Sequence, residues 1–267
     1  MRRIFGYISL AFIFFILISV WTLKIDNSLG YSEFVSGGAL FFIISFLFLF
    51  NMRKRLPFLP LWPAHKWFLL HTIMGFLALL LFWLHAGSLW PKGLYVQILA
   101  SLFYLTTLSG IVGLIMEKIY PNLLTRIGHE CIYERIPHDI AKIRKKSEKL
   151  ILECTEKTGS DTLAKHYLET LGWFFQRPRF FINNIFGGRD SHNWINQQCA
   201  ILERFLNEAE REYMKQIFTL AEIKRKIDHH YSLQTMLKSW LLIHIPLAAA
   251  AMVMAVWHLI VIQVYFN

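Results

Sequence analysis

Residues 71–85 read HTIMGFLALLLFWLH, a stretch in which two histidines enclose residues that are almost all apolar. The stretch lies within a longer apolar run, residues 67–86. A hydrocarbon core of about 30 Å is crossed by roughly 20 apolar residues of helix. The run therefore predicts a membrane-spanning helix that carries one imidazole, His71 or His85, near each edge of the hydrocarbon.

The rest of the chain has the composition of a membrane protein. Of its 267 residues, 55% are hydrophobic, 16% aromatic and only 17% charged, which is more apolar than an ordinary soluble domain. We expect an all-α integral membrane bundle of five transmembrane helices, with a cytoplasmic helical insert between helices four and five. The predicted spans are residues 4–23, 34–50, 67–86, 96–116 and 240–266. The corresponding domains are residues 1–116 for helices one to four, 117–237 for the insert, and 238–267 for helix five.

The first apolar run has features of a secretory signal peptide, because Arg2 and Arg3 precede it. However, the run is long for the hydrophobic region of a signal peptide. It also ends in the bulky sequence SVWTLK instead of a small-residue cleavage site. We therefore expect a retained transmembrane helix.

The basic residues predict the orientation of the bundle in the membrane. One set of connections carries Arg2, Arg3, Arg53, Lys54, Arg55 and Lys66, whereas the opposite set carries only Lys24 and Lys92. Cytoplasmic loops are enriched in Lys and Arg. We therefore expect a multi-pass protein of the cell's inner (plasma) membrane, with a cytoplasmic N-terminus and insert, and with helices one, three and five running outward. This topology accounts for the net charge of +10, and no nucleic-acid partner is expected.

The polar insert predicts two or three amphipathic helices. One begins near Pro137 and ends at the TGS turn at residues 158–160, and a second covers about residues 161–175. Its apolar face would carry Leu163, Tyr167, Leu168 and Leu171. A third, long helix is expected over about residues 194–227.

The insert lacks the motifs of a nucleotide-binding fold, since it has no GxGxxG and no GxxxxGK[ST] sequence. Its three cysteines form no CxxC pair and no CxxCH haem-attachment motif. The insert is either a solvated helical surface or a docking platform for a redox partner. In the second interpretation, Arg177, Arg179 and Arg189 would contact an acidic protein or lipid headgroups.

Helix five repeats the histidine spacing of helix three. Residues 244–258 read HIPLAAAAMVMAVWH. Fourteen residues of helix rise roughly 21 Å and turn to within about 40° of the starting direction, so each histidine pair lies on one helix face. Because both helices run outward, His71 and His244 would share the inner level of the membrane, and His85 and His258 the outer level.

Two imidazoles at each of two levels favour haem over other metal centres. Haem iron leaves two axial positions for protein ligands, whereas zinc and di-iron centres need three or four ligands at one level. The five spans contain no Asp, Glu, Lys or Arg, which also argues against an ion transporter. Small residues near the histidines, Gly75, Gly87, residues 248–251 and Ala255, would leave room for a porphyrin.

On these histidines and this helix order, the chain resembles two groups of di-haem membrane cytochromes. They are the cytochrome b of quinol-oxidising complexes and the transmembrane domain of ferric reductases and NADPH oxidases. The resemblance implies two haem b groups as cofactors, an inner one held by His71 and His244 and an outer one held by His85 and His258. The PEWY motif of cytochrome b is absent from the sequence. Because the sequence ends after helix five, we expect no flavin and nicotinamide domain like that of the oxidases.

The resulting expectation is a di-haem b-type cytochrome that transfers electrons across the membrane, an oxidoreductase component within a larger hetero-oligomeric complex. Its donor would be a quinol or a cytoplasmic reductant, and its acceptor a protein or a small molecule. One alternative is a non-redox scaffold or sensor whose intramembrane histidines make interhelical hydrogen bonds. Another is a copper or zinc transporter, which would use additional Met or carboxylate ligands.

Overall fold

The computed structural model describes residues 2–28, 31–50, 63–128 and 131–266. Within these ranges the chain is helical and contains no strand, so the predicted all-α class is confirmed. The chain forms two compact units. Unit 1 comprises residues 1–115 and 240–267, and unit 2 comprises residues 116–239. Arg53, Lys54 and Arg55, on which the predicted orientation partly depends, lie outside the described residues.

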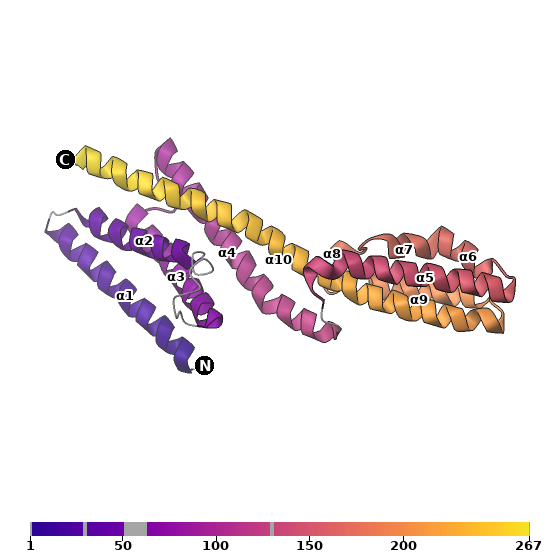
Figure 1. Ribbon diagram of the computed structural model, residues 1–267. Helices are drawn as coiled ribbons and strands as arrows, with labels where there is room; N and C mark the ends of the chain where they lie inside the picture. Colours follow the sequence, from indigo (N-terminus) through magenta and orange to yellow (C-terminus); the bar gives the residue numbers. More distant parts are fainter. Residues whose placement is uncertain (1, 29–30, 51–62, 129–130, 267) are drawn as a thin grey trace. The chain divides into compact units, whose positions relative to one another are not determined.

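Unit 1 contains the apolar helices. They are α1 (Arg2–Asn27), α2 (Ser32–Leu49), α3 (Ala64–Ala86), the first part of α4 (Leu94–Ile127) and the last part of α10 (Glu208–Phe266) (Figure 1). Among the described residues, these five helices are long and apolar enough to cross a membrane. The chain is thus a multi-pass membrane protein.

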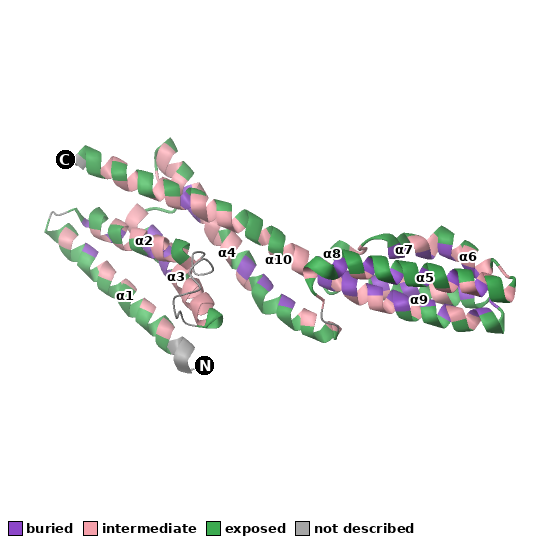
Figure 2. Cartoon of the chain, viewed as in Figure 1, coloured by how far each residue is buried: buried purple, intermediate pink, exposed green. Residues whose placement is uncertain are grey.

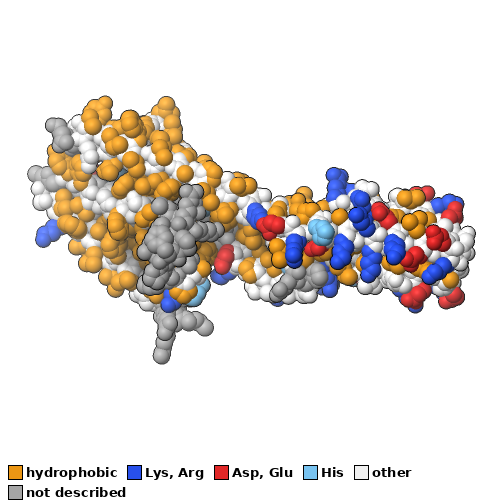
Figure 3. All heavy atoms as spheres, in the orientation of Figure 1, with side chains coloured by type: hydrophobic (Ala, Val, Ile, Leu, Met, Phe, Trp, Pro, Cys, Tyr) orange, Lys and Arg blue, Asp and Glu red, His pale blue; other side chains and the backbone are white. Residues whose placement is uncertain are grey.

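The interior of unit 1 is built where α2, α3 and α4 meet. Its buried side chains include Leu40 and Ile43 from α2, Leu81 from α3 and Phe103 from α4. Many other large apolar side chains of these helices are exposed (Figures 2 and 3). In a bilayer, lipid chains cover such side chains at no hydrophobic cost.

Two of the apolar helices extend beyond their predicted ends. Helix α4 continues past Met116 to Ile127 and includes Pro121. Helix α10 is 59 residues long, and its polar first part continues into the apolar part without interruption, through Pro246. Hydropathy locates only the apolar section of a helix, because the backbone hydrogen bonds continue irrespective of side-chain polarity.

Unit 2 is a helical bundle with its own core. It contains α5 (Ile136–Thr158), α6 (Thr162–His166), a π-helical segment η3 (Tyr167–Leu171), α7 (Gly172–Gln176), α8 (Phe181–Ile185) and α9 (Asp190–Glu203), together with a short 3-10 helix η2 (Tyr133–Arg135) and the polar part of α10. Pro137 lies in the first turn of α5, and Gly159, in the left-handed conformation, ends that helix, as predicted. Charged side chains cover the outside of this unit (Figure 3).

Two sequence predictions for unit 2 were wrong in detail. Leu168, expected on a buried face, is 78% exposed. The π segment that contains it has a wider turn than an α-helix, which places this residue outside the apolar face.

The single helix expected over residues 194–227 is instead divided between α9 and α10. The segment between α9 and α10 ends at Asn207. Its side-chain oxygen accepts a hydrogen bond from the backbone N–H of Glu210, as a helix N-cap residue does.

A buried ion pair joins α10 to the loop before α8. The ammonium of Lys224 lies 2.5 Å from a carboxylate oxygen of Asp228, and both side chains are almost fully buried. Lys224 also donates to the backbone carbonyl of Arg177, and Asp228 accepts from the backbone N–H of Arg179. These hydrogen bonds compensate the burial of the two charges, and they hold the loop against α10.

Candidate functional site

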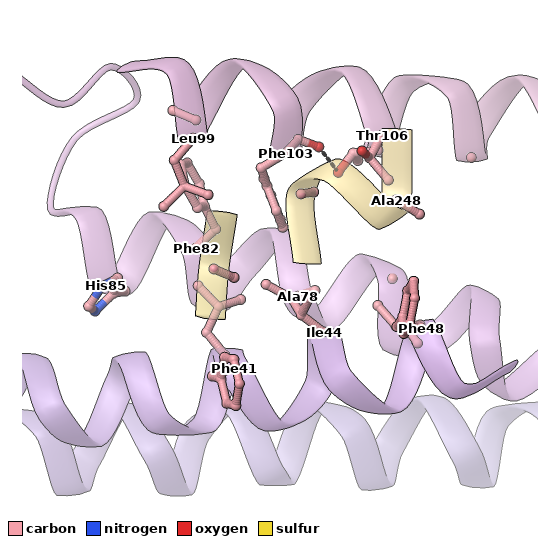
Figure 4. Close-up of a pocket in the computed structure, with 18 of the residues that line it drawn as sticks. Phe41, Ile44, Phe48, Ala78, Phe82, His85, Leu99, Phe103, Thr106 and Ala248 are labelled. Carbon is pink, nitrogen blue, oxygen red and sulfur yellow. Dashed lines mark hydrogen bonds between the residues drawn. The ribbon is translucent and has the colours of Figure 1, made fainter. Parts of the chain in front are cut away.

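Unit 1 contains a partly open, apolar cavity of about 800 Å³ between α2, α3, α4 and α10. Figure 4 shows part of its lining, with Phe41, Ile44 and Phe48 from α2 facing side chains of α3 and α4. The volume lies within the range of small-molecule and cofactor sites. All four of the predicted histidines, His71, His85, His244 and His258, line this cavity.

At one end of the cavity, α3 and α10 bring His85 and His258 together. Their ring centres are 6.4 Å apart, and the ring planes are inclined by 80°. Tyr95 of α4 stacks against His258 at 6.0 Å. Its hydroxyl donates to the carbonyl of Met254, which fixes the tyrosine to α10.

Fourteen residues away along both helices, His71 and His244 form the second pair. Both imidazoles line the cavity. Phe50 packs against His71 with ring centres 4.6 Å apart. Trp240 stacks on His244 at 5.2 Å and donates its indole N–H to the carbonyl of Ser109.

Two serines bind the histidines from neighbouring helices. The hydroxyl of Ser109 lies 2.7 Å from Nδ1 of His244, and that of Ser36 lies 3.2 Å from Nδ1 of His85. A hydrogen bond at Nδ1 fixes the orientation of the ring and leaves Nε2 for a ligand. In His71 and His258, Nδ1 is buried and has no hydrogen-bond partner among the described residues.

Glycines on α2 and α4 make room for the imidazoles. A Cβ atom at Gly37 would lie 2.8 Å from Cε1 of His85, and one at Gly110 would lie 3.6 Å from Cε1 of His244. The indole of Trp240 rests directly on Gly113, where no side chain would fit. The close approach of α2 to α3 therefore depends on Gly37, and that of α4 to α10 on Gly113, whereas the contact at Gly110 would be of ordinary van der Waals length.

Only some of the small residues that were predicted to leave room for a porphyrin line the cavity. Gly75 and Ala248, Ala251 and Ala255 line the cavity. Gly87 has a left-handed backbone and ends α3, so its role is that of a helix C-cap.

The donor set suits a planar group that takes one imidazole on each side. Two metal–imidazole bonds of about 2 Å, plus about 1 Å from each nitrogen to its ring centre, separate the ring centres by about 6 Å. The 6.4 Å between His85 and His258 is close to this value. No group of three or more His, Cys, Asp or Glu side chains in the described ranges could hold a metal ion. A haem needs only two protein ligands, and the apolar lining suits a porphyrin, so the residues present fit this group.

Several residues around the cavity escaped prediction from the sequence. Ser36, Gly37, Ser109, Gly110 and Gly113 lie on helices that carry no histidine. The only signal for them is that small residues recur three or four apart on α4, as they often do where membrane helices pack closely. This spacing does not identify the helix against which the small residues pack.

Comparisons with protein-family models, with curated proteins and with solved structures gave no match to this chain. The fold and the cavity define the class as a helical, multi-pass membrane protein with an internal histidine-lined site.

Proposed function

We propose that the protein is a di-haem b-type cytochrome that carries electrons across the membrane. In this proposal His71 and His244 hold one haem, and His85 and His258 hold the other. The single observation that carries the proposal is the convergence of four imidazoles, two at each end, on one apolar intramembrane cavity. Polar groups inside a bilayer are costly and usually functional.

The chain's own residues would bind and orient the two groups. Ser36 hydrogen-bonds to His85 of one pair and Ser109 to His244 of the other, and each contact would fix the orientation of its imidazole. Phe82, Phe103 and the cavity-lining alanines exclude water, which in turn affects the redox potential of a bound haem. When bound, haem supplies a one-electron couple between ferrous and ferric iron, and the protein supplies ligation and electrostatics.

The proposed partners follow from the expected topology. Electrons would enter from a quinol or a cytoplasmic donor at one haem and leave from the other to a protein or small acceptor. The protein would work as an oxidoreductase component of a larger complex in the plasma membrane, with unit 2 in the cytoplasm. The stronger basic charge of the connections assigned to the inner side supports this orientation.

The visible absorption spectrum of the protein purified in mild detergent tests the proposal. We expect a Soret band, sharp α and β bands after reduction with dithionite, and two haems per chain by pyridine haemochromogen assay. The matched control is His65→Ala, because His65 lies on the same helix but outside the cavity. Protein expressed with ample haem that shows no Soret band would rule out the proposal.

A second function is favoured by the two serine–histidine hydrogen bonds, which link α2 to α3 and α4 to α10. Such bonds are what a non-redox scaffold or sensor would use to hold its helices together. In that case, the protein would lack porphyrin. Replacing Ser109 with Ala would then lower the free energy of unfolding of the protein by about 0.6 kcal/mol, the average for such intramembrane hydrogen bonds.

A further inference from the structure

The loop from Arg177 to Gly188, which includes α8, presents large apolar side chains outward from unit 2. Ile182 is 71% exposed and Phe186 is 84% exposed. The exposed side chains of Arg177 and Arg189 flank them in the sequence. Exposed apolar groups beside basic residues are typical of segments that lie in the membrane–water interface.

This loop is held rigidly in place, so the exposure of its side chains is built into the fold. The Lys224–Asp228 pair binds the backbone on both sides of Pro178. Asn184, which is fully buried, donates to the carbonyl of Arg179 and lies 3.4 Å from the hydroxyl of Ser232.

The loop also contains a strained backbone. Phe180 has a φ of 57°, a conformation that costs a bulky residue free energy. It persists only where the surrounding structure determines it, as happens at functional sites.

The loop lies at the end of unit 2 where the chain connects to the transmembrane helices. Phe181 packs against Tyr231 with ring centres 6.4 Å apart, and a Cβ atom at Gly187 would lie 3.8 Å from the side chain of Leu123. Ser232 precedes the apolar residue Trp240 by eight residues, or about 12 Å of helix, and Leu123 follows Met116 by seven residues, or about 10 Å. The headgroup region extends roughly 5 to 8 Å beyond the hydrocarbon on each side. The residues that the loop contacts are thus only a few ångströms of helix farther from the apolar spans than the headgroup region is deep, which is within reach of large side chains.

We propose that Ile182 and Phe186 insert into the headgroup region of the bilayer that contains the chain's own transmembrane helices, with Arg177 and Arg189 on anionic lipid phosphates. Three features support lipid as the occupant. The loop contacts Tyr231 of α10 and Leu123 of α4, two helices that continue into the lipid-facing spans. The side chains that flank it, Arg177 and Arg189, are positive, and its few apolar side chains are too small a patch for a stable protein interface. The acidic residue next to Arg189 is Asp190, and its carboxylate accepts a hydrogen bond from the side chain of Asn183 within the same loop region.

Spin labelling of the full-length protein in nanodiscs tests this proposal. Single labels are attached at Ile182→Cys and, separately, at Phe186→Cys, so that each variant keeps the other apolar side chain. The control is Phe205→Cys, because Phe205 is a 70% exposed aromatic residue close to the first residue of α10, about 50 Å of helix from Trp240. The native thiols interfere little. Burial raises the pKa of all three native thiols, that of Cys131 to about 11, that of Cys199 to about 12 and also that of Cys154, so their reactive thiolates are scarce at neutral pH.

The measured quantities are the accessibilities of each label to oxygen, which enters lipid, and to a water-soluble nickel chelate. In discs of phosphatidylcholine mixed with phosphatidylglycerol, we expect labels at 182 and 186 to favour oxygen and the label at 205 to favour nickel. Replacing Arg177 and Arg189 together with Gln should shift the equilibrium between immersed and exposed loop about fivefold per arginine toward the exposed form.

Three outcomes would overturn the proposal. The first is nickel accessibility at 182 and 186 equal to that at 205. The second is exclusion of both reagents, which would indicate a protein partner or a second copy of the chain. The third is a depth that is unaffected by the arginine substitutions, since anionic headgroups would then have no role. None of these readouts depends on haem, so the proposed redox function is tested separately.

Discussion

The imidazole pairs are the residues on which the proposed function depends. His85 and His258 approach each other from different helices at a separation that leaves space for one metal between them. Each of the four rings also contacts a specific neighbour, a serine hydroxyl or an aromatic ring. Such contacts restrict the rotamers of the histidines, and in metal sites restricted ligands increase the affinity for the metal.

Replacing His85 with Ala should remove one haem and leave the other. The ligands of the second group, His71 and His244, lie at the opposite end of the cavity, so their geometry does not depend on His85. The measurement is haem content together with low-spin signals in electron paramagnetic resonance. Retention of two low-spin haems in the His85→Ala variant would contradict the assignment.

Substitution of Gly37 tests whether the position of the His85 imidazole matters. In Gly37→Ala, the new methyl group would lie 2.8 Å from the ring of His85, so the imidazole must shift. We expect a change in the spectrum and redox potential of the haem at His85 and His258. Gly38→Ala is the matched control, because a Cβ atom at Gly38 has no neighbour within 4 Å. Equal effects of the two substitutions would show that the contact with His85 is unimportant.

At the scale of the helices, the long helix α10 has a separate role in each of its parts. Its polar part holds the loop before α8 through Lys224 and Asp228, and its apolar part carries His244 and His258. Buried ion pairs contribute little net stability when they are intact. Removing one partner is costly, because it leaves an uncompensated buried charge.

Asp228→Asn should therefore lower the free energy of unfolding of unit 2 by about 3 kcal/mol. The corresponding change in an exposed pair, Asp161→Asn beside Lys165, should cost less than about 1 kcal/mol. Limited proteolysis followed by mass spectrometry compares the two variants. We expect faster cleavage of residues 177–189 only in Asp228→Asn. Similar cleavage in both would mean that the buried pair does not hold the loop.

The apolar helices could be predicted from the sequence because hydropathy and length determine them directly. The equal histidine separations predict which imidazoles share a level of α3 and α10, and the rings of His85 and His258 lie 6.4 Å apart. The π segment at residues 167–171 and the break before Glu208 could not be predicted, because neither changes the local apolar pattern. Ser36 and Ser109 escaped prediction for a different reason. Their contacts depend on the rotation of α2 and α4 against helices that are distant in the sequence.

At the scale of the whole molecule, the two histidine levels lie roughly 21 Å apart along helices that span the bilayer. Two redox centres at that spacing would connect the two faces of the membrane. We expect vesicles containing the loaded protein to transfer electrons from an external reductant to a trapped, membrane-impermeant oxidant. His244→Ala and His258→Ala should each abolish the transfer, and His65→Ala should leave it unchanged. Transfer by empty vesicles at the same rate would contradict the prediction.

The contact between Trp240 and Gly113 has a consequence for the evolution and engineering of the chain. Because these residues touch within unit 1, the two points where the polar segment leaves and re-enters the apolar bundle are adjacent. Excising residues 117–237 and closing the gap with a short flexible linker should leave a chain of about half the length that still assembles with haem. Absorption spectra of such a minimised chain would measure how independent the two modules are, and total loss of pigment would show that the bundle needs the inserted module to assemble.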